Sequence, residues 1–107
     1  MNKKEFDRLP SAPPLPELEL GKVVMTSGVI ALLAWVENGT AEIQQMLKRH
    51  RSGDWGNLDD EDKAANDRAA DSGDARILSA YELFGGKVWI ITEWDRSVTT
   101  ILLPSEY

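Results

Sequence analysis

The last third of the chain consists of three short segments rich in strand-forming residues and separated by turns, which predicts β-strands. In the segment RILSAYEL, every second position from Ile77 to Leu83 falls on one side of a strand. Residues 88–93 are rich in β-branched and aromatic side chains, and residues 98–103 form a further strand that a proline ends. Because short turns join the three segments, we expect an antiparallel meander.

Two helical patterns precede these strands. Residues 29–37 (VIALLAWVE) are apolar nearly all round, which predicts a helix buried against the sheet, with Thr26 or Ser27 as its N-cap. Residues 40–50 carry apolar side chains at helical spacing, which predicts a second helix with one inward stripe.

A third helix is predicted over residues 60–72, with Asp59 as its N-cap and further acids in its first turn. It contains few large apolar residues, so we expect it on the surface. Residues 21–25 can form a short strand before the helices. The order of elements predicts an α+β fold with three helices followed by a three- or four-stranded antiparallel meander, the helices packed on one face.

Composition divides the chain into two parts. Residues 1–20 hold four of the five prolines, which disfavour helices and central strands, so we expect a flexible, proline-rich arm. Residues 21–107 then form a single α+β domain. The absence of cysteine excludes disulfides and thiolate metal sites. No apolar run approaches the roughly 20 residues that span a bilayer. The start lacks the apolar stretch of a signal peptide, so we expect a cytoplasmic protein without membrane contact. We expect no cofactor.

The formal net charge of −6 is concentrated in one segment. Residues 54–74 contain eight acidic and two basic side chains, and the rest of the chain is balanced. A local acidic patch of this kind can bind a basic protein or mimic the phosphates of a nucleic acid. The residues that we expect at this binding surface are Asp54, Trp55, Asp59, Asp60, Glu61, Asp62 and Asn66, with Trp94 and Asp95 from the last turn.

Two of the four tryptophans, Trp35 and Trp89, are expected in the core, and the other two lie in loops. Trp55 and Trp94 can anchor a partner, or they can fasten their loops to the body of the domain. Because a large apolar side chain in a turn favours burial, we expect Trp94 to pack against another group, for which Trp55 is the candidate.

The chain has one histidine, His50, at the end of the second predicted helix. It can lie on the surface and compensate the helix dipole, or it can act as a general acid/base, for which an ordinary pKa of about 6.5 is suitable. A single histidine makes a histidine-rich zinc site implausible, and we assign no residue to a metal.

Polar side chains are dense in the last predicted turn and just after it. Arg96 carries a planar donor fork that can hold a phosphate or a carboxylate, with Ser97 and Thr99 as further donors. The alternative is that Asp95 and Ser97 only shape the turn and that Arg96 pairs with a neighbouring acid.

Four segments of the chain resemble a family of small uncharacterised proteins that bacterial plasmids, prophages and integrated elements carry. They are RHRSGDWG (49–56), DKAAND (62–67), RILSAY (76–81) and WIITEWDRSVTTILLPSEY (89–107). Such proteins are often labelled plasmid-related or type I restriction subunits, but a methyltransferase domain cannot fit in a chain of this length. The resemblance covers nearly everything after Gly21 and implies an accessory protein of a mobile element, with no defined activity.

The order of helices and meander is also similar to small ribonucleases of the barnase, EndoU and RelE type, which work without metal. This likeness implies that His50 is the acid/base, that Arg96 and Arg76 hold the phosphate, and that Ser97 or Thr99 is a supporting donor. The acidity of the chain departs from those enzymes and disfavours binding to RNA.

Two functions are therefore open. The first is a non-catalytic accessory protein that binds a protein partner through its acidic segment. The second is a metal-independent ribonuclease, and only here is nucleic acid a partner. Both require the loop after the second helix and the last turn to lie side by side over the sheet. The sequence does not indicate an oligomeric state.

Overall fold

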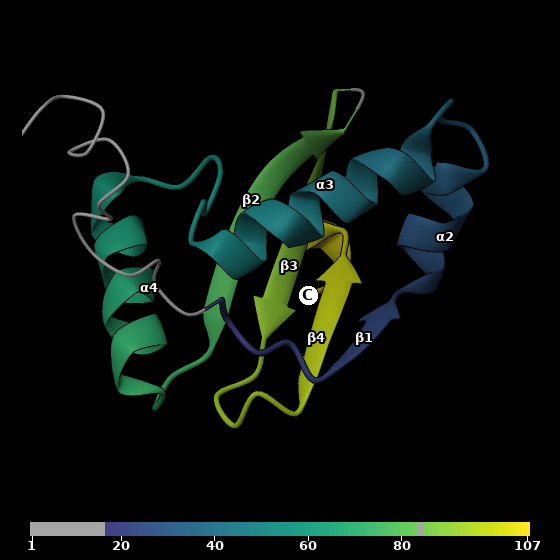
Figure 1. Ribbon diagram of the computed structural model, residues 1–107. Coiled ribbons are helices and arrows are strands. Elements are labelled where there is room, and N and C mark those ends of the chain that lie inside the picture. Colours follow the sequence, from purple (N-terminus) through teal and green to yellow (C-terminus); the bar gives the residue numbers. More distant parts are fainter. Residues whose placement is uncertain (1–16, 84) are drawn as a thin grey trace, which may run out of the picture.

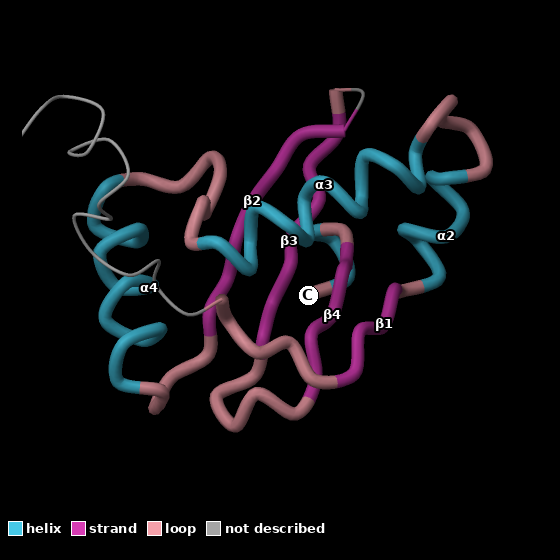
Figure 2. The backbone as a smooth tube through the Cα atoms, viewed as in Figure 1, coloured by secondary structure: helices cyan, strands magenta, loops and turns pink. Residues whose placement is uncertain are grey.

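The computed structural model describes residues 17–83 and 85–107, which form helices around one four-stranded sheet (Figures 1 and 2). In chain order the elements are strand β1 (Lys22–Met25), helices α2 (Ser27–Leu33), α3 (Gly39–Ser52) and α4 (Asp60–Ser72), strands β2 (Ile77–Leu83), β3 (Gly86–Thr92) and β4 (Val98–Leu102), and the 3₁₀ turn η1 (Pro104–Glu106). Helix α3 crosses one face of the sheet, α4 lies beside β2, and α2 lies at the opposite end, beyond β1 (Figure 1). None of the helices in the described part of the chain has the length and apolar character needed to cross a membrane.

The predicted topology is wrong in its first strand. Strands β2, β3 and β4 do form an antiparallel meander, but β1 pairs in parallel with β4, so the sheet is mixed and its order is β1-β4-β3-β2. The short strand before the helices is present, as expected, but it belongs to the main sheet. Only α3 crosses a face of the sheet, whereas α4 and α2 lie at its two ends, so the prediction that all helices pack on one face is wrong. The sequence could not show this pairing, because a four-residue strand carries no signal for its partner and parallel neighbours can be far apart in the chain.

The first helix also differs from the prediction. Thr26 is the N-cap, as expected, and its hydroxyl accepts from the N–H of Val29 (3.4 Å). However, α2 ends at Leu33 and buries only Val29. Trp35 lies in the turn that follows and is 88% exposed, so its assignment to the core is wrong. An all-round apolar segment is buried only where other layers cover it, and α2 packs at the end of the sheet rather than across it.

The core lies between α3 and the face of the sheet that α3 covers. The alternation in β2 is confirmed, since every second residue from Ile77 to Leu83 is buried there. Helix α3 contributes Ile43 and Met46 to the same cluster. On the other face, Trp89 is only partly buried, not a full core residue, and packs edge-on against Tyr107 with ring centroids 5.6 Å apart.

Helix α4 has the predicted bounds, and its N-cap Asp59 accepts from the N–H of Asp62 (2.8 Å). The helix closes the outer edge of β2 through Asn66, which is buried. The Asn66 amide donates to the carbonyl of Leu78 (2.7 Å) and accepts from its N–H (3.4 Å), as a neighbouring strand would. Asn66, expected at a binding surface, is therefore part of the fold.

The loop between α3 and α4 continues this closure along the edge of β2. The N–H of Ala80 donates to the carbonyl of Trp55 (3.1 Å), and the N–H of Asn57 donates to the carbonyl of Ala80 (2.7 Å). Gly56, between them, has a φ of 75°, and a Cβ there would collide with the carbonyl of Ala80. Only glycine allows this close approach, which brings Trp55 to the end of the sheet.

Replacing Asn66 by alanine should lower the free energy of unfolding by about 2–3 kcal/mol, because the partly buried N–H and C=O of Leu78 would lose their partner. Urea denaturation followed by tryptophan fluorescence measures this loss. The matched control is Arg68→Ala at an exposed position of the same helix, which should change stability by less than about 0.5 kcal/mol. Equal losses in the two variants would contradict the role given to Asn66.

Candidate functional site

A groove of about 600 Å³ lies between α4 and the end of α3. The described residues that line it come from the segment before β1 (Glu17, Leu18, Glu19), the end of α3 and its loop (Arg51, Ser52, Gly53, Trp55), α4 (Asp67, Ala70, Asp71) and the β3–β4 turn (Arg96). The loop after α3 and the last turn thus meet at one surface, as both functional hypotheses require. Of the residues singled out in the sequence, Trp55 and Arg96 line this groove.

The loop after α3 is held in place by a compact polar cluster. Arg49 Nε donates to Asp54 (2.7 Å), and its guanidinium lies 4.7 Å from the centre of the Tyr81 ring. The Tyr81 hydroxyl donates to the carbonyl of Asp54 (2.6 Å). The hydrogen bond from Arg49 lowers the pKa of Asp54, whereas burial raises the pKa of Tyr81 to about 12. The carboxylate and the carbonyl of Asp54 are therefore both engaged in holding the loop in place.

Trp55 forms the inner wall of the groove. It is 5% exposed, and its indole N–H donates to Asp67 of α4 (2.8 Å). Its side chain packs with Ala69 and Ile77. Trp55 thus fastens the loop to α4. Because little of its ring is exposed, it can contact a partner only as part of the groove lining.

The segment before β1 also lines the groove. The N–H of Leu18 donates to the carbonyl of Arg51 (2.9 Å), and Glu17 makes an ion pair with the Arg51 side chain (2.5 Å). Leu18 packs against the Trp55 cluster. Of the predicted arm, residues 1–16 lie outside the described residues, and the part from Glu17 on contacts the domain.

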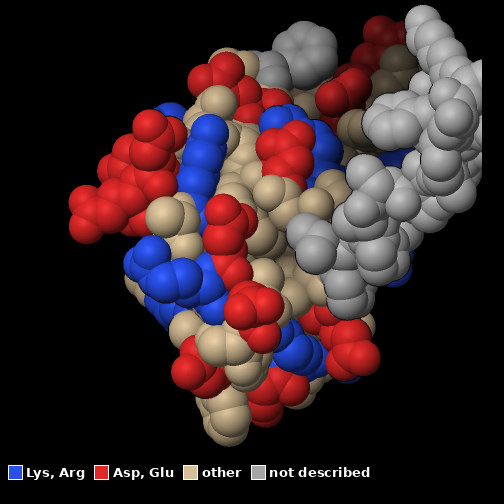
Figure 3. Space-filling model, turned by 60° about the vertical axis from the view of Figure 1, so that its left-hand side comes forward, with Lys and Arg blue, Asp and Glu red and all other residues tan. Residues whose placement is uncertain are grey.

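The groove is acidic. Four carboxylates line it, against two arginines. Arg51 is paired with Glu17, and Asp67 is held by Trp55. The carboxylates of Glu19 and Asp71 are exposed and have no hydrogen-bond or ion-pair partner among the described residues. Figure 3, in which the α4 side is turned forward, shows acidic side chains on this face, interspersed with lysines and arginines.

Arg96 joins the last turn to the end of α4. One terminal nitrogen donates to the carbonyls of Ala75 (2.7 Å) and Glu93 (3.1 Å), and the other donates to the carbonyl of Ala69 (2.8 Å). Instead of pairing with an acid, the guanidinium donates to three carbonyls, of which that of Ala69 lies in the last turn of α4, where positive charge is favourable. Three of its five N–H donors are used in this way.

His50 is fully buried, so its interpretation as a surface residue is wrong. Its ring packs edge-on under Trp55, with centroids 5.8 Å apart, and both nitrogens are hydrogen-bonded to hydroxyls. Nδ1 lies 2.5 Å from the hydroxyl of Ser79, and Nε2 lies 2.8 Å from that of Thr92. No exposed edge of the ring remains for a substrate.

The direction of these hydrogen bonds follows from their last member. The carbonyl of Leu20 can only accept, so Thr99 donates to it (2.7 Å) and must accept from Thr92 (2.7 Å). Thr92, its proton used, accepts from His50 Nε2, so Nε2 carries a proton. Burial keeps the ring neutral, so Nδ1 carries no proton and accepts from the hydroxyl of Ser79. Burial, aided by the charge of Arg96, lowers the pKa of His50 to about 4.

The other candidate residues are dispersed. Asp95 accepts from the N–H (3.1 Å) and the hydroxyl (2.6 Å) of Ser97, which lowers the pKa of Asp95 and confirms that this pair shapes the turn. Trp94 is 62% exposed and does not pack on Trp55, contrary to expectation. Arg76 lies over Tyr107, 5.1 Å from its ring centre, and does not line the groove.

The acids of the first turn of α4 remain exposed to water. Asp59 is engaged as the N-cap, whereas Asp60, Glu61 and Asp62 extend the acidic surface beyond the groove. They stabilise the start of the helix through its dipole. Within residues 17–83 and 85–107, no three carboxylate or imidazole side chains gather closely enough to hold a metal ion.

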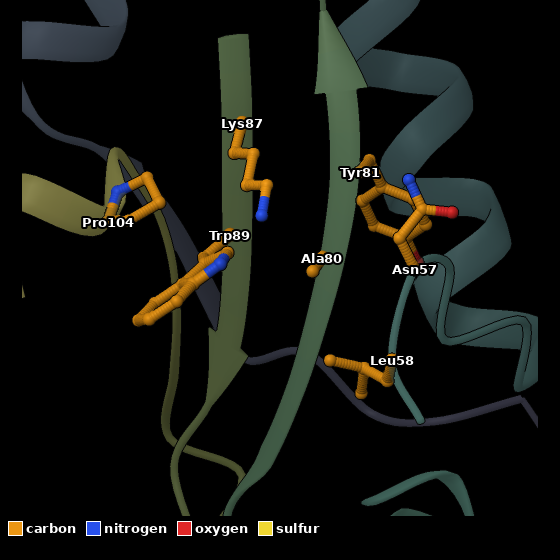
Figure 4. Close-up of a pocket in the computed structure, with 7 residues that line it drawn as sticks. All are labelled: Asn57, Leu58, Ala80, Tyr81, Lys87, Trp89 and Pro104. Carbon is orange, nitrogen blue, oxygen red and sulfur yellow. The ribbon is translucent and has the colours of Figure 1, made fainter. Parts of the chain in front are cut away.

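A smaller pocket of about 260 Å³ spans β2 and β3 (Figure 4). In Figure 4, Trp89 and Lys87 lie along β3, and Asn57 and Leu58 lie on the far side of β2. Its lining contains one charged side chain, Lys87, and no cluster of titratable groups. The α3–α4 loop contributes residues to both this pocket and the groove, but no residue lines both. The pocket has no feature that indicates a reaction.

Comparison of the chain with protein families, curated proteins and solved structures gave no match. The likeness to plasmid- and prophage-borne proteins stays a prediction. Sequence reasoning missed Glu19, Asp67 and Asp71 as groove residues and Thr92 as a partner of His50. The one usable signal was the spacing of Asp67 and Asp71, which lie four residues apart and therefore on one side of α4.

Lowering the pH from 7.5 to 5 should reduce the free energy of unfolding by about 2 kcal/mol through His50 alone. The unfolded chain takes up this proton near pH 6.5 and the folded chain only near 4, so the stabilisation is complete above pH 6.5 and is lost as the pH falls towards 4. Denaturation at several pH values should show this slope, and it should be flatter for His50→Gln.

Because the chain has one histidine, proton NMR gives an independent readout. The ring signals of folded protein should not titrate between pH 7.5 and 5. A midpoint near 6.5 in the folded state would contradict the buried neutral ring.

Proposed function

We propose that this protein is a non-catalytic binding module that captures a basic protein partner in the groove beside α4. The groove itself carries the proposal. It combines apolar surface from Leu18 and Ala70 with the carboxylates of Glu19 and Asp71. A lysine or arginine side chain matches this arrangement, since its stem can lie on apolar surface while its charge meets a carboxylate.

Helix α4 extends the acidic surface away from the groove. Its thirteen residues, at about 1.5 Å each, spread carboxylates over roughly 20 Å. Such a row can take the place of phosphates and attract a partner with a basic face. On this proposal the protein acts in the cytoplasm. The partner that the resemblance implies is a protein of the host or of the same mobile element.

The ribonuclease alternative finds little support in this geometry. An acid/base must lie within hydrogen-bond reach of the substrate. His50 is enclosed beneath Trp55, Thr99 is buried, and the fork of Arg96 is largely occupied by carbonyls. Arg76 lies elsewhere, against Tyr107. The residues that the likeness to ribonucleases implies do not converge on one accessible site.

Reversing the free carboxylates of the groove should weaken the binding of basic peptides. The probe is a fluorescent lysine decamer, followed by anisotropy at low salt. The double variant Glu19→Lys/Asp71→Lys should bind it at least about tenfold more weakly than the natural chain, since two attractions become repulsions.

The control for this experiment is Glu37→Lys/Glu42→Lys, which makes the same change in net charge at exposed positions around the start of α3. Only a small loss is expected there. If both double variants weaken the peptide equally, affinity follows net charge and the groove is not the site.

Purified protein should leave single-stranded RNA intact, because the ring of His50 is not accessible. Gel analysis of an end-labelled oligonucleotide after prolonged incubation tests this. Cleavage by the natural chain that is lost in His50→Gln, while circular dichroism shows the variant folded, would favour the ribonuclease instead.

A further inference from the structure

The two edge strands of the sheet, β2 and β1, differ in how their outer backbone groups are hydrogen-bonded. The edge of β2 is closed by Asn66 and by the loop around Gly56. At the other edge is β1, whose Lys22 and Thr26 donate to the β4 side, to the carbonyls of Ser97 and Ile101 (3.0 Å each). Because backbone groups alternate along a strand, the N–H and C=O groups of the two residues at positions 23 and 25 point away from β4.

This edge is also apolar. Val23 and Met25 are each 41% exposed. Of the six large hydrophobic side chains that are exposed in the described part of the chain, four lie between residues 23 and 35, in β1, in α2 and in the turn after it. Exposed strand edges of this kind pair readily with another strand, and the described residues give this one neither a bulge nor a charge that points inward. Helix α2, which follows the C-terminal end of β1, packs against β4.

We infer that β1 pairs with β1 of a second copy of this chain, antiparallel and about a two-fold axis at Val24. In this register Val23 of each copy faces Met25 of the other, so the outward backbone groups of both residues form four hydrogen bonds. Val24 faces its own counterpart at a non-hydrogen-bonded position, where side chains are closest. The result is one continuous eight-stranded sheet.

The distribution of charge favours a second copy at this edge. Lys22 is the one charged residue between Gly21 and Met25, and in the proposed register it faces Thr26 rather than another lysine. The acidic surface of α4 lies at the opposite end of the sheet (Figure 1). Two copies that met through α4 would bring like charges together, whereas pairing through β1 keeps them apart. A two-fold interface of this type is self-complementary.

A single introduced cysteine tests the register, because the natural chain has none. Val24→Cys should form a disulfide-linked dimer under mild oxidation, since only position 24 meets itself across the axis. Val23→Cys, one residue away on the same strand, should cross-link far more slowly. Equal cross-linking of both variants, or none in either, would overturn the inference.

Sedimentation equilibrium tests the association without a covalent bond. The average mass of the natural chain should rise from the monomer towards the dimer with concentration, and Met25→Lys should move the midpoint to at least tenfold higher concentration. Trp94→Lys removes a larger exposed apolar side chain from the β3–β4 turn and should leave the midpoint nearly unchanged. A natural chain that stays monomeric up to millimolar concentration, or an equal effect of both variants, would refute pairing through β1.

Discussion

A buried chain of side-chain hydrogen bonds holds the domain together. It begins at Ser79 on β2, passes through His50 on α3 and Thr92 on β3 to Thr99 on β4, and ends at the carbonyl of Leu20. An unpaired polar group in a core is costly, and no buried side-chain nitrogen or oxygen among the described residues lacks a partner. The position of the helix over the sheet, the register of three strands and the path of the segment before β1 therefore depend on one another.

The shape of the groove depends on this row of buried hydrogen bonds. His50 packs edge-on against Trp55, which lines the groove, and Leu20 lies two residues after Leu18, which lines it as well. Arg96 then ties the last turn to the end of α4. The polar groups that first indicated catalysis are thus used to position surfaces. What they leave exposed in the groove is a pair of carboxylates, those of Glu19 and Asp71.

The sequence pattern predicted those features of the fold that depend on neighbouring residues. The alternation in β2 and the capped bounds of α4 were readable, because a strand face and a helix start depend on neighbouring residues. The pairing of β1 with β4, the exposure of Trp35 and the burial of His50 were not, because each depends on what another part of the chain covers. His50 shows this most clearly. Its place at a helix end is typical of a surface residue, and only the hydroxyls of two distant strands, from Ser79 and Thr92, make its burial favourable.

The same reasoning explains why the acidic residues lie where they do. The β2 edge is closed by an asparagine side chain and a tight loop, so α4 can stand beside it with its acids in water. At the other end, β1 has apolar side chains, one charge and, at positions 23 and 25, backbone groups that point away from β4. Two copies joined there would carry their acidic grooves at the two far ends of one sheet. A partner with two basic sites at matching distance could then be held at both ends, which strengthens binding without any new contact.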